Sequence, residues 1–327
     1  MCFTAFLTTC SSSAGNILVR VTHAAVTHVD LLYAQGLHQN NRRHMKPPFI
    51  LGMEFAGNVA AAPKESKFSV GTRVFGAGTG AFGEYISVPE GQVREAPQQW
   101  TNAEACAVGA SGAISQGALV DIAQIQPGQI VLVLGASGGL GVMAVQIAAA
   151  YGAKVIAVVG SEEKGEVVKR LGATHVVSYH EPKWEDKVKS FTPDGEGVHH
   201  VYDSIGAVQS SIRCLRYGGK VIIVGFAARG GKMEELQMNR ILLKGVSVVG
   251  YRFGEEGRRT PQQIEKTWNS FMKLANEGKI KPVIYNVEYA GLESVPRALK
   301  DMEARKPWGR AIITIADEEA LKDRSKL

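Results

Sequence analysis

The fold of this chain is decided by residues 130–141, IVLVLGASGGLG, in which five apolar residues run into a glycine-rich turn. The apolar run predicts a buried strand, and the residues that follow, VMAVQIAAAYGAK, predict a buried helix that ends at Gly152. A second apolar run, KVIAVV at 154–159, predicts the next strand. Strand, glycine turn, helix and strand together form a unit of about 30 residues, which is the length of a dinucleotide-binding βαβ unit.

The spacing of the glycines gives each of them a separate role. Gly138 lets the backbone approach a pyrophosphate closely, and Gly141 lets the helix pack on the strand. Ala136 stands where the first glycine of the GxGxxG pattern would be, and it still permits the turn. A helix N-terminus carries a partial charge of roughly +0.5, so its free N–H groups favour an anion. A glycine triplet also marks purely structural turns. Its place between strand and helix predicts a cofactor site formed by Ala136, Ser137, Gly138, Gly139, Leu140 and Gly141.

The residues at the end of the second strand favour NADPH as the cofactor. An NAD site usually has an Asp or Glu about 20 residues beyond the glycine turn, where it binds the ribose hydroxyls. This chain has Gly160 and Ser161 at that point, without a carboxylate at the strand end. Ser161 can donate to a 2′-phosphate, Lys164 can neutralise it, and Tyr179 after the third strand can supply another hydroxyl. The alternative is that Ser161 only caps a helix whose first turn, 162–164, is solvated.

The composition is typical of a compact protein with two domains, and it limits the partners. The chain has 327 residues, 45% of them hydrophobic, and its net charge of +6 is mild. Basic residues are scattered apart from a small cluster at 42–44, so nucleic acid is not expected as a main partner. Glycine interrupts every apolar run that approaches the roughly 20 residues of a membrane helix, so no membrane segment is expected.

The cysteines and the N-terminal segment bear on location. The four cysteines have no CxxC spacing, which argues against a disulfide scaffold or a zinc knuckle and favours a reducing compartment: Cys2, Cys10, Cys106 and Cys214. The first acidic residue is Asp30, as in a transit peptide, but the first arginine is Arg20, which counts against one. We therefore expect a cytoplasmic protein with a frayed or replaced first segment.

The rest of the chain divides into three stretches. Residues 16–100 contain short apolar runs punctuated by glycine and proline, which predicts a small all-β barrel. Residues 103–120 predict a helix of small residues, and beyond Tyr179 helices and strands continue to alternate. Six strands that alternate with helices predict a doubly wound parallel sheet. The last stretch predicts pieces that rejoin the barrel, namely a helix at 261–277, a strand at 281–290, a helix at 292–303 and a strand at 309–316.

These motifs, in this order, resemble the medium-chain dehydrogenase/reductase family. The resemblance rests on PFxxGMEFAG at 48–57, GASGGLG at 135–141, GSEEK at 160–164, LGATHVVSY at 171–179, GGKVIIVGF at 218–226 and GRAIITI at 309–315. Within the family the chain is similar to the zinc-free, zeta-crystallin-like quinone oxidoreductase branch and its quinone-oxidoreductase-like subgroup. The resemblance covers residues 16–316 and implies a doubly wound parallel Rossmann sheet inserted in a GroES-like β-barrel domain. The implied divisions are 1–111 and 254–327 for the barrel domain and 112–253 for the Rossmann domain.

The resemblance also bears on metal binding. Zinc-dependent relatives bind zinc through a Cys in the segment that here reads AAVTHVDLL, 24–32, and through the His of a GHE motif. This chain has no Cys in that segment, and it has Met53 between Gly52 and Glu54. A catalytic zinc site needs three N, S or O ligands and an open position, which a thioether beside one carboxylate does not supply. No metal is therefore expected.

The resemblance implies hydride transfer from the nicotinamide C4 of NADPH to a quinone or an α,β-unsaturated carbonyl. The substrate would lie between the barrel and the nucleotide domain, beside the segment near Asp30 and the ends of the fifth and sixth strands. Arg310 would stand near the cofactor. The resemblance places five further residues beside the nicotinamide: Gly225, Phe226, Ala227, Tyr251 and Phe253.

The candidate catalytic residues are Asp30, Tyr33 and Tyr251, and His38 is a further candidate proton donor. For both tyrosines and the histidine the alternative is a lining role, because a reduced quinone can be protonated by water. Family members commonly have Asn, Tyr and Thr at three positions near the substrate. This chain departs from that pattern, which implies a less polar site and leaves room for a different substrate, at Thr27, Leu32 and Ile114.

The sequence thus predicts an NADPH-dependent, zinc-independent reductase of a small-molecule substrate. Two alternatives stay open: an enoyl reductase of a conjugated thioester, and an NADPH-binding protein with little catalysis and a structural or RNA-binding role. The segment VSVVGY, 246–251, at the edge of the sheet predicts a homodimer formed by strand pairing. Family members have two more strands before ILVRV, so residues 1–15 either rebuild this edge or leave the barrel incomplete.

Overall fold

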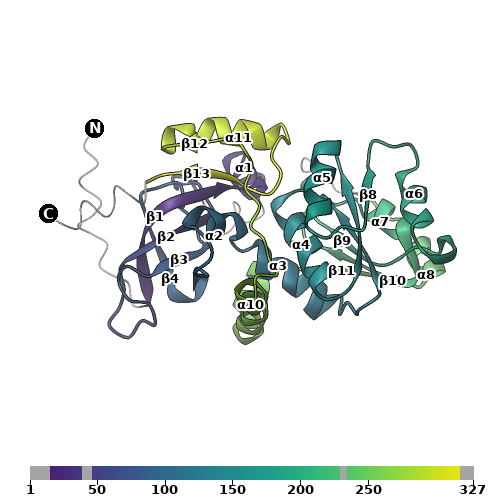
Figure 1. Cartoon of the computed structure of the whole chain (residues 1–327), viewed down its shortest axis with the longest axis horizontal. Helices are drawn as coiled ribbons and strands as arrows, with labels where there is room; N and C mark the ends of the chain where they lie inside the picture. The colour runs from purple at the N-terminus through teal and green to yellow at the C-terminus, as the bar shows by residue number, and fades with distance from the viewer. Residues whose placement is uncertain (1–14, 39–45, 229–233, 317–327) are drawn as a thin grey trace. The chain divides into compact units, whose positions relative to one another are not determined.

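The computed structural model describes residues 15–38, 46–228 and 234–316, and the chain divides into two units (Figure 1). The first unit comprises residues 1–110 and 282–327, and the second comprises 111–281. The predictions about the first 14 residues and about the basic cluster at 42–44 lie outside the described residues. Each unit is described in turn.

The second unit is built on a six-stranded parallel sheet with the order β11-β10-β9-β6-β7-β8. The order reverses at β6, whose neighbours β7 and β9 continue the sheet in opposite directions, and such a switch point is where doubly wound sheets bind ligands. The predicted doubly wound parallel sheet is therefore confirmed. The strands are β6 Ile130–Leu134, β7 Lys154–Val159, β8 His175–Ser178, β9 Val198–Asp203, β10 Leu215–Ile223 and β11 Ser247–Gly250.

Burial explains why the residues of β6 and of the helix that follows it are apolar. All five residues of β6 are buried, as expected for a parallel strand covered on both faces. The helix α4, Gly139–Ala150, is apolar almost all round, and most of its residues are buried. The other helices of the unit are α3 Ser111–Gln116, α5 Glu162–Arg170, α6 Trp184–Ser190, α7 Val208–Cys214, α8 Met238–Lys244, α9 Phe253–Arg259 and α10 Pro261–Asn276.

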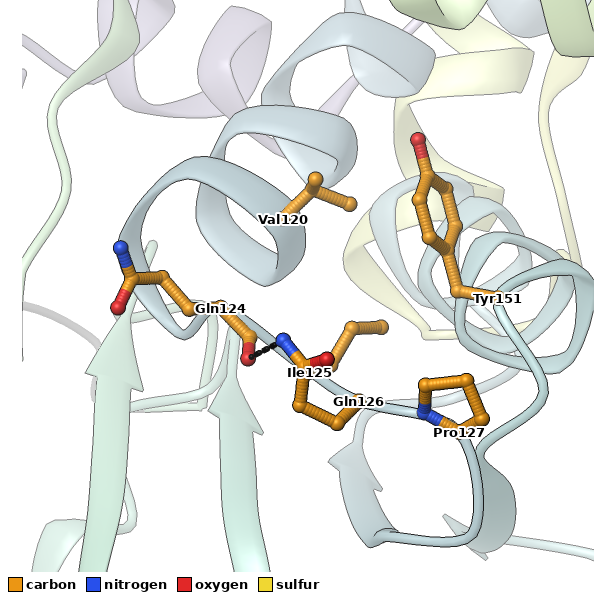
Figure 2. A pocket seen from close by; sticks show the side chains of 6 residues that line it. All are labelled: Val120, Gln124, Ile125, Gln126, Pro127 and Tyr151. Carbon is orange, nitrogen blue, oxygen red and sulfur yellow. Dashed lines mark hydrogen bonds between the residues drawn. The ribbon is translucent and has the colours of Figure 1, made fainter.

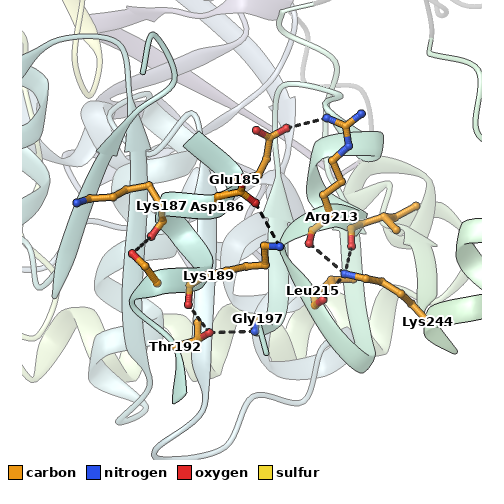
Figure 3. A network of polar contacts seen from close by, with 11 residues as sticks. Glu185, Asp186, Lys187, Lys189, Thr192, Gly197, Arg213, Leu215 and Lys244 are labelled. Atoms are coloured by element: carbon orange, nitrogen blue, oxygen red, sulfur yellow. Dashed lines mark hydrogen bonds and ion pairs between the residues drawn. The ribbon is translucent and has the colours of Figure 1, made fainter. Parts of the chain in front are cut away.

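Polar contacts join three of these helices (Figure 3). Lys244 at the end of α8 donates from Nζ to the carbonyls of Ile212, Arg213 and Leu215, at 3.0, 3.0 and 2.7 Å. These carbonyls belong to the last turn of α7 and the start of β10, so the ammonium group binds the negative end of the helix. Glu185 of α6 lies 3.3 Å from the Arg213 guanidinium, which connects α6 to the same helix.

The unit boundary after residue 253 that the sequence predicts differs from the structure, where the second unit continues to Lys281. The reason is the packing of α10 on α3. A side chain at Gly112 would overlap the ring of Phe271, so only glycine permits this approach. Thr267 also donates to Asp121 Oδ2 at 2.5 Å. Both contacts join residues that are far apart in the sequence, so no local sequence pattern predicts them.

The predicted helix at 103–120 is interrupted. The structure has α2, Asn102–Val108, then α3 and a π-helical segment, Gly117–Ile122. The break is at Gly109, whose φ of 48° is left-handed, and a Cβ there would lie 2.6 Å from Cδ of Glu54. The stretch 102–122, which contains three glycines, is long and apolar enough to cross a membrane by length and composition, but 78% of its most apolar window is buried inside the structure.

The first unit is a seven-stranded sheet around the long strand β1, Asn16–Val26. β1 pairs antiparallel with β2, β4 and β13, so strands from both ends of the chain share one sheet and one apolar core. The predicted strand at 281–290 is reduced to two residues and an isolated bridge at Ile284. The other elements are α1 His28–Ala34, β2 Glu54–Ala61, β3 Arg73–Ala77, β4 Tyr85–Pro89, β5 Val93–Glu95, β12 Tyr289–Ala290, α11 Val295–Glu303 and β13 Ala311–Thr314.

Candidate functional site

The glycine turn after β6 is shaped by Gly135, which the sequence analysis had given no role. Its φ is 65°, in the left-handed region that favours glycine. Ala136 is fully buried and its N–H donates to the Val158 carbonyl at 3.1 Å, so the turn is anchored to the neighbouring strand. The signal that could have identified Gly135 is its position directly after the last strand residue.

Gly138 and Gly141 have different surroundings. A Cβ at Gly141 would overlap the Gly135 carbonyl oxygen and lie 2.6 Å from Cα of Ala136, so this glycine permits the helix to pack on the turn. A Cβ at Gly138 would meet only the Gly135 oxygen, at the ordinary contact distance of 3.5 Å. Packing within the protein therefore does not require glycine at 138, and a pyrophosphate close to the backbone would.

The first turn of α4 can hold an anion. Gly138 is the N-cap residue of this helix of 12 residues, and it has no side chain that could bind the first N–H groups. The N–H groups of a first turn have no partner inside the helix, and they carry the positive end of its dipole. The turn also lies at the switch point between β6 and β9. These features fit the pyrophosphate of a dinucleotide.

Two alanine substitutions separate these roles. Gly138→Ala is expected to leave the midpoint of thermal unfolding nearly unchanged and to weaken binding of a dinucleotide by about 1–3 kcal/mol, because the new methyl group has room in the protein but not beside a pyrophosphate. Gly141→Ala is expected to lower stability, because its methyl group overlaps backbone atoms. Thermal unfolding and fluorescence titration measure the two effects. A large loss of stability in Gly138→Ala would contradict the assignment.

The end of β7 brings together three of the residues predicted to bind the nucleotide. Ser161 accepts a hydrogen bond from the Lys164 N–H at 3.3 Å and caps α5, as the alternative interpretation proposed. A hydroxyl that accepts one bond still has a hydrogen to donate, so capping does not exclude phosphate binding. Tyr179 lies over Gly160, where a Cβ would be 2.9 Å from Cζ of the tyrosine. The tyrosine thus covers the point where an NAD site has a carboxylate.

The predicted nicotinamide residues follow β10 and β11. Gly225 packs closely on Ser204, the residue that follows β9, since a Cβ at 225 would lie 2.9 Å from the Ser204 oxygen, and the Ala227 N–H donates to that oxygen at 3.2 Å. Phe226 is 46% exposed. Phe253 begins α9, with its ring centroid 6.4 Å from that of Tyr251.

Tyr251 packs inside the unit. Its side chain is buried, and the phenol lies against Gly117 of the π-helical segment, where a Cβ would be 2.7 Å from Cζ. Burial raises the pKa of the Tyr251 hydroxyl, and the nearby Asp121 carboxylate adds to the shift. A phenol with a raised pKa in a packed site favours a lining or packing role over proton donation.

Arg310 does not extend freely toward a cofactor but forms a buried ion pair. Its Nε lies 2.8 Å from Oε2 of Glu54, and its Nη2 lies 3.3 Å from Oε1. The two side chains are only 10% and 7% exposed. Oε1 also accepts from the Ala110 N–H at 3.2 Å. The family resemblance placed Arg310 near the cofactor, and its pair with Glu54 was not expected from the sequence.

Asp30 is also buried, in the capping box of α1. Its Oδ2 accepts from the backbone N–H and the hydroxyl of Thr27, both at 2.8 Å, while Oδ1 has no hydrogen-bond partner among the described residues. Burial raises the pKa of Asp30 to about 6, partly offset by the two Thr27 bonds. The pKa of Asp30 is therefore close to neutral pH.

Tyr33 and His38, two candidate proton donors, lie together. Their ring centroids are 4.3 Å apart with a tilt of 30°, and Phe49 approaches Tyr33 edge-on at 6.1 Å. Tyr33 is buried and lies one turn along α1 from Asp30. Asp30, Tyr33 and His38 thus place an acid, a phenol and an imidazole in one short segment, 30–38, which the resemblance placed beside the substrate.

The described part of the chain has no group of three or more His, Cys, Asp and Glu side chains that could hold a metal ion. Met53 lies next to Glu54 in sequence, and its sulfur accepts from the Thr79 hydroxyl at 3.8 Å. Glu54 is engaged by Arg310. This donor set does not fit a catalytic zinc ion, which requires three protein ligands.

A cavity of about 540 Å³ lies at the other end of the nucleotide unit (Figure 2). It is lined by the segment that leads into β6 and by Tyr151 at the end of α4, so it is remote along both elements from the glycine turn. Figure 2 shows the bond of 3.1 Å from Gln126 Nε2 to the Gln124 carbonyl. The lining is Val120, Gln124, Ile125, Gln126, Pro127 and Tyr151.

Comparison with known proteins places the chain in a family. Residues 13–98 match the family model described as alcohol dehydrogenase GroES-like domain, and residues 139–274 match that of zinc-binding dehydrogenase. The quinone oxidoreductase of Sus scrofa is 31% identical over 91% of this chain and 89% of its own length. The chain belongs to the medium-chain dehydrogenase/reductase family. The quinone oxidoreductase-like protein 2 of Bos taurus is also 31% identical, over 91% and 85% of the two chains.

A solved structure of this family, a mycobacterial protein complexed with NADPH, is 25% identical with a TM-score of 0.81, over 92% of both chains. Membership confirms the predicted fold class, a Rossmann sheet with a GroES-like domain, and the similarity to the quinone oxidoreductase branch. The chain is therefore an oxidoreductase that binds a nicotinamide cofactor and acts on a small molecule. The description of one family model names zinc, which the donor set around Met53 does not fit.

Proposed function

We propose that this medium-chain dehydrogenase/reductase uses NADPH and, without zinc, reduces a quinone or an α,β-unsaturated carbonyl. The observation that carries the choice of NADPH is the end of β7. Gly160 and Ser161 stand there without a carboxylate, and Tyr179 covers the glycine. An NADH site would need an acid at this point for the ribose hydroxyls. The relative from Sus scrofa that is named quinone oxidoreductase supports the substrate class.

The chain's own residues bind and orient the cofactor in this proposal. The first turn of α4 receives the pyrophosphate, and Ser161, Lys164 and Tyr179 receive the 2′-phosphate. NADPH supplies a hydride, that is, two electrons and one proton. A quinone that accepts a hydride becomes a quinol anion and takes one further proton, which water or the Tyr33–His38 pair provides.

A fluorescence titration with NADPH and NADH in EDTA, followed by a quinone, tests the proposal. We expect selective binding of NADPH and loss of its signal when quinone is added. Binding of NADPH without oxidation by quinone would contradict the proposed substrate. Turnover of a crotonyl thioester would then identify the enoyl reductase alternative, and no turnover with either substrate would leave a binding protein with little catalysis.

Lys164→Glu tests the nucleotide assignment. The substitution is expected to weaken NADPH binding by about 1–3 kcal/mol, because it removes a charge-assisted contact and adds repulsion of the 2′-phosphate. NADH lacks that phosphate, so its affinity is expected to stay nearly unchanged. The same titration measures both affinities. Equal losses for the two nucleotides would show that Lys164 does not contact the 2′-phosphate.

We also propose that the protein forms a homodimer through β11. This strand ends the sheet order, and unpaired strand edges favour pairing with another copy. The preceding helix α8 exposes three apolar side chains, with 69%, 80% and 72% of their surface accessible: Met238, Leu242 and Leu243. Sedimentation is expected to show a dimer, and the double variant Leu242→Asp and Leu243→Asp is expected to dissociate it. A monomeric unmodified protein would overturn this assignment.

A further inference from the structure

Two buried hydroxyl groups reach the first turn of α4 from inside the nucleotide unit. Ser115 of α3 and Tyr202 of β9 are both fully buried. Ser115 Oγ lies 3.1 Å from the carbonyl oxygen of Leu140 and 2.9 Å from the hydroxyl oxygen of Tyr202. Leu140 is the second residue of α4. A helix and a strand of the unit are therefore connected to the start of the helix that follows the glycine turn.

The donors and acceptors in this connection can be assigned. A carbonyl oxygen only accepts, so Ser115 donates its single hydroxyl hydrogen to Leu140. Ser115 Oγ then accepts from Tyr202, whose hydroxyl is the donor in the contact of 2.9 Å. Both bonds thus run in one direction, from Tyr202 through Ser115 to the carbonyl. Hydrogen bonds arranged in this way polarise and strengthen one another.

The peptide unit that contains the Leu140 carbonyl also contains the N–H of Gly141. The Val142 N–H donates to the Gly138 carbonyl at 2.9 Å and makes the first bond of the helix. The Gly141 N–H precedes it, so it belongs to the first turn, where N–H groups have no partner inside the helix. In a trans peptide the C=O and the N–H point in opposite directions. A bond that fixes the oxygen therefore also fixes the direction of the N–H, and a polarised carbonyl makes this N–H a stronger donor.

We propose that Ser115 and Tyr202 are positioning residues for the dinucleotide. They hold the peptide between Leu140 and Gly141 so that its N–H faces the pyrophosphate at the first turn of α4, and they strengthen this N–H as a donor. Neither side chain touches the cofactor, because both are fully buried. This role rests on the proposed placement of the pyrophosphate at α4. NADPH and NADH share the pyrophosphate, so the role does not depend on the choice of nucleotide or substrate.

Fluorescence titration of the whole chain with NADPH and with NADH tests the proposal. Ser115→Ala is expected to bind both nucleotides about three- to tenfold more weakly, because the hydrogen bond that holds the peptide is lost. Tyr202→Phe leaves Ser115 its bond to Leu140, so we expect a smaller loss, of about two- to threefold. The double variant is expected to bind no more weakly than Ser115→Ala, because Tyr202 acts through Ser115.

The amide resonance of Gly141 in a nitrogen–proton correlation spectrum reports on the peptide itself. A hydrogen bond to the Leu140 oxygen draws electron density from the nitrogen of the same peptide. We therefore expect this nitrogen resonance to shift in Ser115→Ala without nucleotide, and to shift less in Tyr202→Phe.

Thr192→Val is the matched control for a general loss of stability. The Thr192 hydroxyl is also buried in this unit, where it donates to the Lys189 carbonyl at 2.7 Å and accepts from the Gly197 N–H at 2.9 Å. It precedes β9, whereas the glycine turn follows the end of β6. We expect this variant to lower the midpoint of thermal unfolding at least as much as Ser115→Ala, because it leaves a buried N–H without its acceptor. Both nucleotide affinities and the Gly141 resonance are expected to stay unchanged.

Unchanged affinity for both nucleotides in Ser115→Ala, or a loss for only one of them, would overturn the proposal. An equal loss in Thr192→Val would also overturn it, because binding would then follow the stability of the unit. Gly138→Ala tests the placement of the pyrophosphate separately. If Gly138→Ala keeps its affinity for dinucleotides, the placement at α4 is wrong. If Gly138→Ala loses affinity and Ser115→Ala does not, the placement holds and Ser115 has no positioning role.

Discussion

Arg310→Met is expected to lower the free energy of unfolding by about 3–5 kcal/mol, because it leaves the buried Glu54 carboxylate without its counter-ion. The guanidinium is bound at two atoms, and both side chains are almost fully withdrawn from solvent. Removing one member of such a pair costs the desolvation of the other. Urea denaturation followed by circular dichroism measures the loss.

A double variant separates the ion pair from simple packing. Glu54→Gln in the Arg310→Met background removes the stranded charge, so we expect it to recover part of the lost stability. Lys306→Met, which breaks the exposed pair with Asp301, is the control and is expected to change stability little. If Arg310→Met behaved like Lys306→Met, the pair would not carry the stability that its burial indicates.

Asp30→Asn is expected to change how stability depends on pH. Burial raises the pKa of Asp30 from 3.8 to about 6, so between these values the folded protein binds a proton that the unfolded chain has released. Stability therefore falls as the pH rises through this window. The asparagine variant does not titrate, so the stability of the unmodified protein relative to it should fall by roughly 2 kcal/mol from about pH 4 to pH 7.

Urea denaturation of both proteins across this pH range measures the difference. The control is Glu104→Gln, which alters the corresponding carboxylate in the exposed capping box of α2 and so reports the loss of a cap alone. A stability difference between Asp30→Asn and the unmodified protein that does not change with pH would show that Asp30 is ionised throughout.

The nucleotide unit could be predicted from the sequence because its signals are local. The apolar run at 130–134, the glycines that follow it and the apolar helix up to Gly152 each indicate their own structure. The alternation of six strands with helices indicates a doubly wound parallel sheet. The residues at the end of β7 were identified in the same way, since Gly160 and Ser161 come directly after the strand.

What the sequence did not reveal depends on contacts between distant residues. Arg310 meets Glu54 across more than two hundred positions, and no periodicity indicates such a pair. Tyr251 packs on Gly117, and α10 packs on Gly112, so the unit boundary and the role of this tyrosine became clear only in three dimensions.

The first unit is formed by two segments from opposite ends of the chain, and this determines when it can fold during synthesis. Glu54 is translated long before Arg310, and at about 5–20 residues per second the interval is roughly 10–50 s. The second unit is one continuous stretch, 111–281, so it can fold on the ribosome during this interval. The first unit has to wait for its last strand, β13, and until then the edge of β1 and the charge of Glu54 are exposed to chaperones and proteases.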